Sequence, residues 1–121
     1  MTIPTPGSVT DAEWKRLTKQ ALDPVLAGKI SVSAKTGAYT IARGDSLVLV
    51  DATGAAVTIT LPAANPYSGL QFTIKKTDAS ANAVTVDGSG AETIDGMATR
   101  ALAAQYQSIT IVSDGTGWQI T

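Results

Sequence analysis

Two alternating runs of apolar and polar residues, Gln71–Lys75 and Ala83–Val86, form the clearest pattern in the chain. Phe72 and Ile74 alternate with polar residues in the first run, and two valines flank a threonine in the second. Because successive side chains of a strand point to opposite faces, each run has one apolar and one polar face. The two runs and the polar turn between them predict a β-hairpin.

Further short runs predict that the hairpin belongs to a larger body of strands. Leu47–Val50 is continuously apolar, and Val57–Leu61 alternates strictly. The other expected strands are Glu92–Ile94, Thr99–Leu102, Ser108–Val112 and Trp118–Ile120, with tight turns at Asp87-Gly88 and Asp95-Gly96. About eight short strands separated by turn signals are typical of an antiparallel β-sandwich or a jelly-roll-like barrel. We therefore expect an all-β domain over residues 39–121.

Residues 1–38 have a different character, and they begin with an arm. Pro4 and Pro6 disfavour helix and central strand, so residues 1–9 are expected to be extended. Such an arm is either a frayed terminus or a segment that docks on a partner through apolar residues such as Ile3. The arm is followed by a short helix and then by a transition segment that ends at residue 38.

The pattern predicts one short helix, over residues 10–23. A capping-box pattern marks its start, and a proline directly follows its last residue. Trp14, Leu17 and Ala21 recur at helical spacing and give one apolar stripe. The stripe packs either on the body of its own subunit or on another chain, and the sequence leaves both possibilities open.

Composition excludes several classes of function. Cysteine and histidine are absent, which excludes disulfides and thiolate metal sites and removes the commonest general base. No run approaches the roughly 20 apolar residues of a membrane span, and the N-terminus lacks the features of a signal peptide. The net charge of −1 gives no indication of nucleic-acid binding. The basic residues nevertheless concentrate in residues 1–43, and the acidic residues concentrate after them.

Candidate chemistry in the body has a simpler structural interpretation. Asp87, Glu92 and Asp95 could hold calcium, but their spacing fits no EF-hand loop, and Asp-Gly pairs are typical of turns. The serines have no histidine to activate them, and no pair of carboxylates resembles a glycosidase site. Lys75-Lys76 is expected to serve solubility or to protect a sheet edge. We therefore expect no catalytic activity, no cofactor and no bound metal.

The body resembles the β-domain of tailed-bacteriophage virion proteins over residues 39–120. The motifs that carry the resemblance are VDAT, TLPAA, KKTDAS, VDGSGAETIDG and the final SDGTGW. Members of this group include capsid decoration proteins, head fibres and segments of tail fibres. The resemblance implies a β-sandwich knob, assembly as a homotrimer, and a place in the virion.

Residues 1–38 lie outside the resemblance and therefore bear on where in the virion the protein sits. The chain is short, opens on its own arm and contains no coiled-coil or collagen-like shaft, as expected for a complete decoration protein on the outer surface of the phage head. Its partner would be the major capsid protein, with no role for nucleic acid or membrane. The expected capsid-binding residues are Ile3, Pro4, Pro6, Trp14, Arg16 and Leu17.

Two other functions remain open from the sequence. In a tail or baseplate fibre component, the knob would bind a host-surface receptor through exposed loops such as 63–69 and 87–92. In a carbohydrate-binding module, an aromatic side chain such as Trp118 would form a platform, although its alternation with Ile120 favours a place in the core. The run Leu47–Val50 is a candidate for the trimer contact, and the alternative is that an opposite sheet of the same sandwich covers it.

Overall fold

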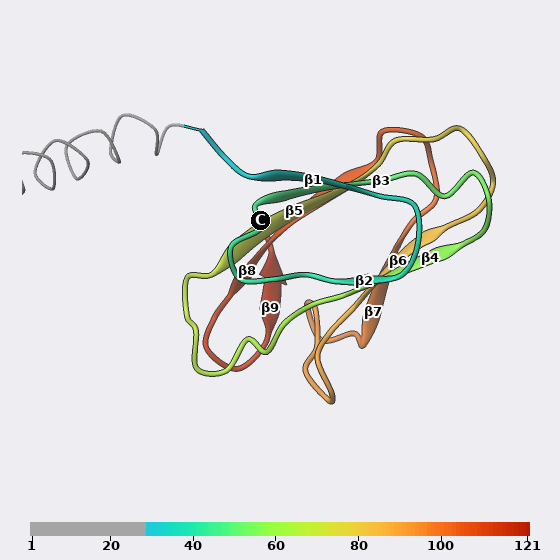
Figure 1. The fold of residues 1–121 in the computed structure, drawn as a ribbon. Helices are drawn as coiled ribbons and strands as arrows, with labels where there is room; N and C mark the ends of the chain where they lie inside the picture. Colours follow the sequence, from blue (N-terminus) through green and yellow to red (C-terminus); the bar gives the residue numbers. More distant parts are fainter. Residues whose placement is uncertain (1–28) are drawn as a thin grey trace, which may run out of the picture. The chain divides into compact units, whose positions relative to one another are not determined.

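The structure is a computed structural model that describes residues 29–121, and in these residues it is all-β (Figure 1). The first sheet has the strand order β1-β3-β5-β8-β9, and the second has the order β2-β4-β6-β7. The strands of the first sheet are Val32–Lys35 (β1), Leu47–Val50 (β3), Gln71–Lys76 (β5), Ser108–Ser113 (β8) and Trp118–Ile120 (β9). Those of the second are Tyr39–Thr40 (β2), Val57–Thr60 (β4), Val84–Asp87 (β6) and Thr99–Leu102 (β7). The two sheets form a sandwich-like body and do not close into a barrel.

Both sheets are mixed, so the prediction of an antiparallel sandwich was wrong in this respect. From β1 to β6 the chain alternates between the sheets, with odd-numbered strands in the first and even-numbered strands in the second. Consecutive strands within each sheet are therefore parallel: β1 with β3, β3 with β5, β2 with β4, and β4 with β6. Only the last three strands add antiparallel pairs, on β6, β5 and β8. The first six strands thus wind between the sheets in three successive coils.

The predicted hairpin of Gln71–Lys75 with Ala83–Val86 is also wrong. These strands, β5 and β6, belong to different sheets, and β5 lies between β3 and β8. The alternation was correct, because Phe72, Ile74, Val84 and Val86 are all fully buried. However, an apolar face can either lie beside its neighbour in one sheet or face it across the core. The same alternation serves both arrangements, so it does not specify the pairing.

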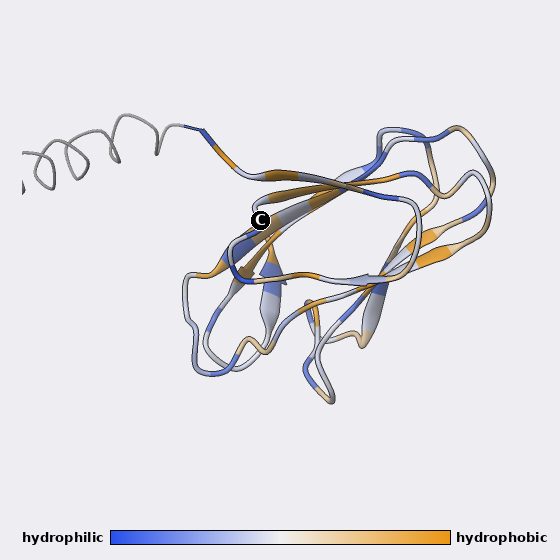
Figure 2. Ribbon diagram, viewed as in Figure 1, coloured by the Kyte–Doolittle hydropathy of each residue, from blue (hydrophilic) through white to orange (hydrophobic). Residues whose placement is uncertain are grey.

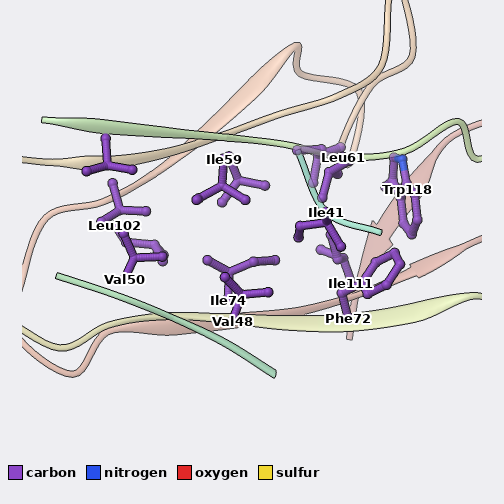
Figure 3. Packing of buried hydrophobic residues seen from close by; sticks show 14 of the residues in the cluster. Ile41, Val48, Val50, Ile59, Leu61, Phe72, Ile74, Leu102, Ile111 and Trp118 are labelled. Carbon is purple, nitrogen blue, oxygen red and sulfur yellow. The ribbon is translucent and has the colours of Figure 1, made fainter. Parts of the chain in front are cut away.

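The core lies between the two sheets and consists mainly of aliphatic side chains (Figure 3). Val48, Val50 and Ile74 enter it from the first sheet, and Ile59 and Leu102 enter it from the second. At one end Phe72 packs on Trp118, with ring centroids 5.6 Å apart. Trp118 is completely buried. It is therefore a core residue, as its alternation with Ile120 predicted, and it offers no exposed platform for a sugar.

The two predicted Asp-Gly turns have different outcomes. Asp95 and Gly96 both have positive φ, at 50° and 81°, and the residues flanking them exchange two backbone hydrogen bonds. This is the geometry of a two-residue type I′ turn, as predicted. Asp87, by contrast, ends β6, and the Gly88 N–H still donates to the Ala98 carbonyl at 3.2 Å. The ladder therefore continues through this pair, and the turn comes later.

The compact unit runs over Ser31–Thr121 and so includes β1, which lies before the expected domain start at residue 39. β1 pairs with β3 over four residues. The expected arm (1–9) and helix (10–23) lie outside the described residues. In the part of the chain that the structure describes, no helix is long and apolar enough to cross a membrane.

Candidate interaction surfaces

All six residues expected to bind the capsid lie outside the described part of the chain. They are Ile3, Pro4, Pro6, Trp14, Arg16 and Leu17. They remain predictions from the sequence, and the surfaces described below belong to residues 29–121 alone.

Lys76 is buried in the body and does not serve as a surface lysine. It is fully buried, and its Nζ donates to Asp78 Oδ2 at 2.7 Å, to the Asp78 carbonyl at 3.1 Å and to the Ser80 carbonyl at 3.0 Å. Its strand, β5, is internal to the first sheet. The expected role of the pair Lys75-Lys76 in solubility or edge protection is therefore wrong for Lys76. The ammonium ion is retained because three acceptors replace its water.

Through Asp78, the buried pair links the connection between β3 and β4 to the connection between β5 and β6. We call this group of hydrogen bonds the strap. Its carboxylate also accepts from the Ala52 N–H at 2.7 Å, while the Asn82 side-chain amide donates to the Ala52 carbonyl at 2.8 Å. Burial raises the pKa of Asp78, but the hydrogen bonds from Lys76, from Ser80 and from the Ala52 N–H lower it by a larger amount. The net result is a pKa well below the ordinary value of an aspartate. The β3–β4 and β5–β6 connections are therefore held together where the chain crosses between the sheets.

Glu92 joins the two loops that the fibre hypothesis singled out. Its Oε1 accepts from the Ala64 N–H at 2.8 Å, and its Oε2 accepts from the Asn65 N–H at 3.2 Å. The Ser113 hydroxyl donates to the Ala64 carbonyl at 2.8 Å from inside the body. Loops 63–69 and 87–92 are thus fixed to each other and to the core. Sequence reasoning named both loops but gave no sign that they meet.

An arginine stacks on a tyrosine of loop 63–69. The guanidinium carbon of Arg43 lies 4.0 Å from the ring centroid of Tyr67, and both side chains are exposed. This geometry is that of a cation–π contact, which leaves the edge of the guanidinium free to bind an anionic group. Twenty-four residues separate the two in sequence, so no local motif could have indicated the pair.

The other exposed or half-buried tyrosines occupy different settings. Tyr39 donates its hydroxyl to Asp45 Oδ2 at 2.5 Å, and the Lys35 ammonium lies 4.0 Å above its ring, so it is held within the body. Tyr106 is 63% exposed and has a φ of 66°, which is uncommon for a residue with a side chain. The Lys75 ammonium lies 5.4 Å from its ring. Tyr106 therefore projects at the end of the first sheet.

The acidic residues considered for calcium are engaged elsewhere. Glu92 holds the loop N–H groups described above, and Asp95 Oδ1 accepts from the Ile120 N–H at 2.9 Å. Within residues 29–121 no group of three or more carboxylates, histidines or cysteines gathers as metal ligands would. The turn interpretation holds for Asp95 and fails for Asp87, as described above.

The outward-facing residues of the two sheets differ in chemistry. We call Val32, Ala34, Leu47, Leu49, Thr73, Lys75, Ser108 and Thr110 the outer face of the first sheet, because they alternate along their strands with the core-facing positions and pair with one another across the sheet. The corresponding positions of the second sheet are Thr40, Thr58, Thr60, Thr85, Asp87, Thr99 and Ala101. Aliphatic residues thus gather on β1 and β3 (Figure 2), and hydroxyl groups predominate on the opposite side.

Leu47–Val50 shows how the aliphatic residues are divided. Val48 and Val50 are fully buried against the second sheet of the same body, whereas Leu47 and Leu49 point outward and are half-buried. An opposite sheet therefore covers one face of this run, and the outward leucines retain the chemistry of a contact surface.

No model of a known protein family matches this chain, and a search of curated proteins found no relative.

Proposed function

We propose that this protein is a capsid decoration protein of a tailed bacteriophage, which binds the outer surface of the head shell and stabilises it. The observation that carries the proposal is the series of motifs over residues 39–120, from VDAT to SDGTGW, which resembles virion β-domains. The described residues support a structural role, since their charged groups form a strap and loop anchors that hold the body together. The protein would act as a homotrimer and carry out no catalysis.

Attachment to the major capsid protein is assigned to the N-terminal segment. Ile3, Pro4 and Pro6 would lie along the shell as an extended arm, and Trp14, Arg16 and Leu17 would bind from the helix predicted over residues 10–23. The excess of basic residues in the first 43 positions suits an acidic shell surface. A partner that binds only the assembled shell stabilises it by mass action.

Co-sedimentation with undecorated capsids tests this function. The full chain should pellet with capsids and stay in the supernatant without them. Trp14→Ala should reduce the pelleted fraction severalfold, because it removes the largest apolar side chain of the proposed contact. Tyr106→Ala, a change to an exposed aromatic residue of the body, is the matched control and should pellet like the unaltered chain. Failure of the full chain to pellet would reject the proposal.

A second candidate is a tail or baseplate fibre component that binds a host-surface receptor. The arrangement that favours it is the loop end of the body, where Glu92 fixes loops 63–69 and 87–92 beside the exposed Arg43–Tyr67 stack. A stacked guanidinium with a free edge is suited to a carboxylate or phosphate on a surface glycan.

Two changes to the chain separate these candidates in binding assays. Deleting residues 1–9 should abolish capsid binding if the protein decorates the head, and should leave cell binding intact if it is a fibre component. Arg43→Ala should have the opposite pattern. Binding to host cells that is lost in Arg43→Ala but kept in Lys29→Ala, a control that removes a cation from a position before β1, would favour the fibre.

A further inference from the structure

The part of the first sheet's outer face that lies on β1 and β3 is apolar and open to solvent. Val32 is 57% exposed, Ala34 is exposed, and Leu47 and Leu49 are half-buried beside them. The register places Val32 opposite Leu47 and Ala34 opposite Leu49, so the four side chains form two adjacent rows. Contiguous exposed apolar groups of this kind are typical of interaction sites.

The edge of the sheet reinforces this surface. Within the described residues β1 pairs on one side only, with β3. The carbonyls of Ser31 and Lys35 accept from the N–H groups of Leu47 and Asp51, both at 2.9 Å. Because alternate residues of a parallel strand bond to the same neighbour, the main-chain groups of Val32 and Ala34 point to the free edge. A surface with both apolar side chains and unpaired main-chain groups is one that proteins usually cover.

The charges on this surface indicate which kind of partner would cover it. Lys75 is the only charged residue of the outer face, and it lies in the row of Ala34 and Leu49 with its ammonium near the Tyr106 ring. No carboxylate lies among the paired strand positions of this face, and Asp51 follows the last residue of β3. A partner recognised through charge would find little to bind on β1 and β3. The same uncharged patch on three copies, however, can meet around a three-fold axis without repulsion between like charges, and interfaces between identical chains are typically more apolar than other surfaces.

We propose that a second copy of this chain covers the outer face of the first sheet, with Val32, Ala34, Leu47 and Leu49 at the centre of the contact. This inference rests on the proposed function only for the number of copies, which the homotrimer sets at three. The contact itself follows from the apolar rows, the unpaired edge and the absence of acidic groups among the paired positions of the face. It assigns the face that the homotrimer would use.

The mass of the full chain in solution, measured by light scattering and by sedimentation equilibrium at micromolar concentration, tests the assignment. The unaltered chain should have three times the mass of one chain. Leu49→Glu should shift the mass to that of a single chain, because an unpaired carboxylate would be buried in the contact. Thr58→Glu places the same charge on the second sheet's outer face and should leave the mass unchanged. Near-ultraviolet circular dichroism should be alike for both variants and the unaltered chain.

Several results would overturn the assignment. One is a mass of a single chain for the unaltered protein. If Leu49→Glu lowers the melting temperature of such a monomer, the face is covered within one chain, and the assignment is also wrong. Another is an unchanged oligomer in Leu49→Glu that keeps its fold. The outcomes are separable from those of the proposed function. If the protein is a multimer but fails to pellet with capsids, this inference stands and the proposed function is rejected. If it is a monomer that pellets with capsids, the assignment of the contact is rejected and capsid binding stands.

Discussion

The ammonium group of Lys76 lies 2.7 Å from Oδ2 of Asp78 in the interior, where the side chains are 0% and 4% exposed. The pair sits at the end of β5, where the chain leaves the first sheet to cross to the second. Through the Ala52 N–H it also holds the crossing that follows β3. The winding of the chain between two sheets is therefore fixed at this end by a polar cluster and not by a hairpin turn.

Lys76→Met should destabilise the body by about 3–5 kcal/mol, because it leaves the carboxylate of Asp78 buried without its cation. Urea denaturation followed by circular dichroism measures the change in free energy of unfolding. Lys29→Met is the matched control, since Lys29 is exposed before β1 and lies outside the proposed contact, and a surface change of this kind should stay within about 0.5 kcal/mol. Equal midpoints for the two variants would contradict the role given to Lys76.

Acid should weaken the protein through the same cluster. The pKa of Asp78 is lower in the folded protein than in the unfolded chain, so its contribution to stability is complete above the unfolded pKa of about 4. That contribution is lost as the pH falls from there toward the lower folded pKa. The melting temperature should therefore change little between neutral pH and about pH 5 and fall below about pH 4.

Asp78→Asn separates this contribution to acid sensitivity from the others. Its melting temperature should fall less steeply with acid than that of the unaltered chain. Some acid sensitivity should remain, since the N–H groups of Thr116 and Gly117 also lower the pKa of Asp114. Parallel curves for the variant and the unaltered chain would show that Asp78 is not a source of the acid response.

Gly88→Ala should destabilise the protein by about 1–3 kcal/mol, an ordinary cost of overpacking. A Cβ at this position would lie closer to the Glu92 carbonyl oxygen than real Cβ atoms lie to any neighbour, so the backbone would have to shift. Gly54→Ala is the control, because a Cβ there meets nothing within 4 Å. Thermal melting compares the two, and a Gly88→Ala variant as stable as Gly54→Ala would contradict this packing.

Glu92→Ala should loosen loop 63–69, because it removes the acceptor of the Ala64 and Asn65 N–H groups. Ala64 is fully buried, so the unsatisfied donor should cost about 1–3 kcal/mol. Hydrogen exchange should show faster exchange at both amides, with the strands still protected. Glu92→Gln keeps a carbonyl acceptor and should retain part of the protection. Unchanged exchange rates in Glu92→Ala would contradict the anchoring role.

Strand positions were largely predictable from the sequence, whereas strand pairing was not. The alternation around Phe72 and Ile74 indicates which side chains of that strand face the core, because the apolar positions recur at every second residue. Pairing depends on where the connections run, and residues 77–83 lead the chain across the core. The Lys76–Asp78 cluster that fixes this crossing reads in sequence as two ordinary surface charges, because nothing local shows that both side chains turn inward.

On the surfaces too, features set by neighbouring residues were predictable from the sequence, and contacts between distant residues were not. The outward position of Leu47 and Leu49 follows from alternation once one face of β3 is known to be buried. The stack of Arg43 on Tyr67 depends on segments that meet only in the folded chain. The same holds for the hydrogen bond from the Ala64 N–H to Glu92. The proposed capsid contacts, such as Trp14, remain predictions from the sequence pattern.

Electron microscopy of intact virions, labelled with antibodies raised against residues 29–121, tests the central proposal most directly. The account predicts label distributed over the outer surface of the head, and its loss from virions whose copy of this chain lacks residues 1–9. Label confined to the tail or baseplate, or absent from the virion, would contradict a role in capsid decoration.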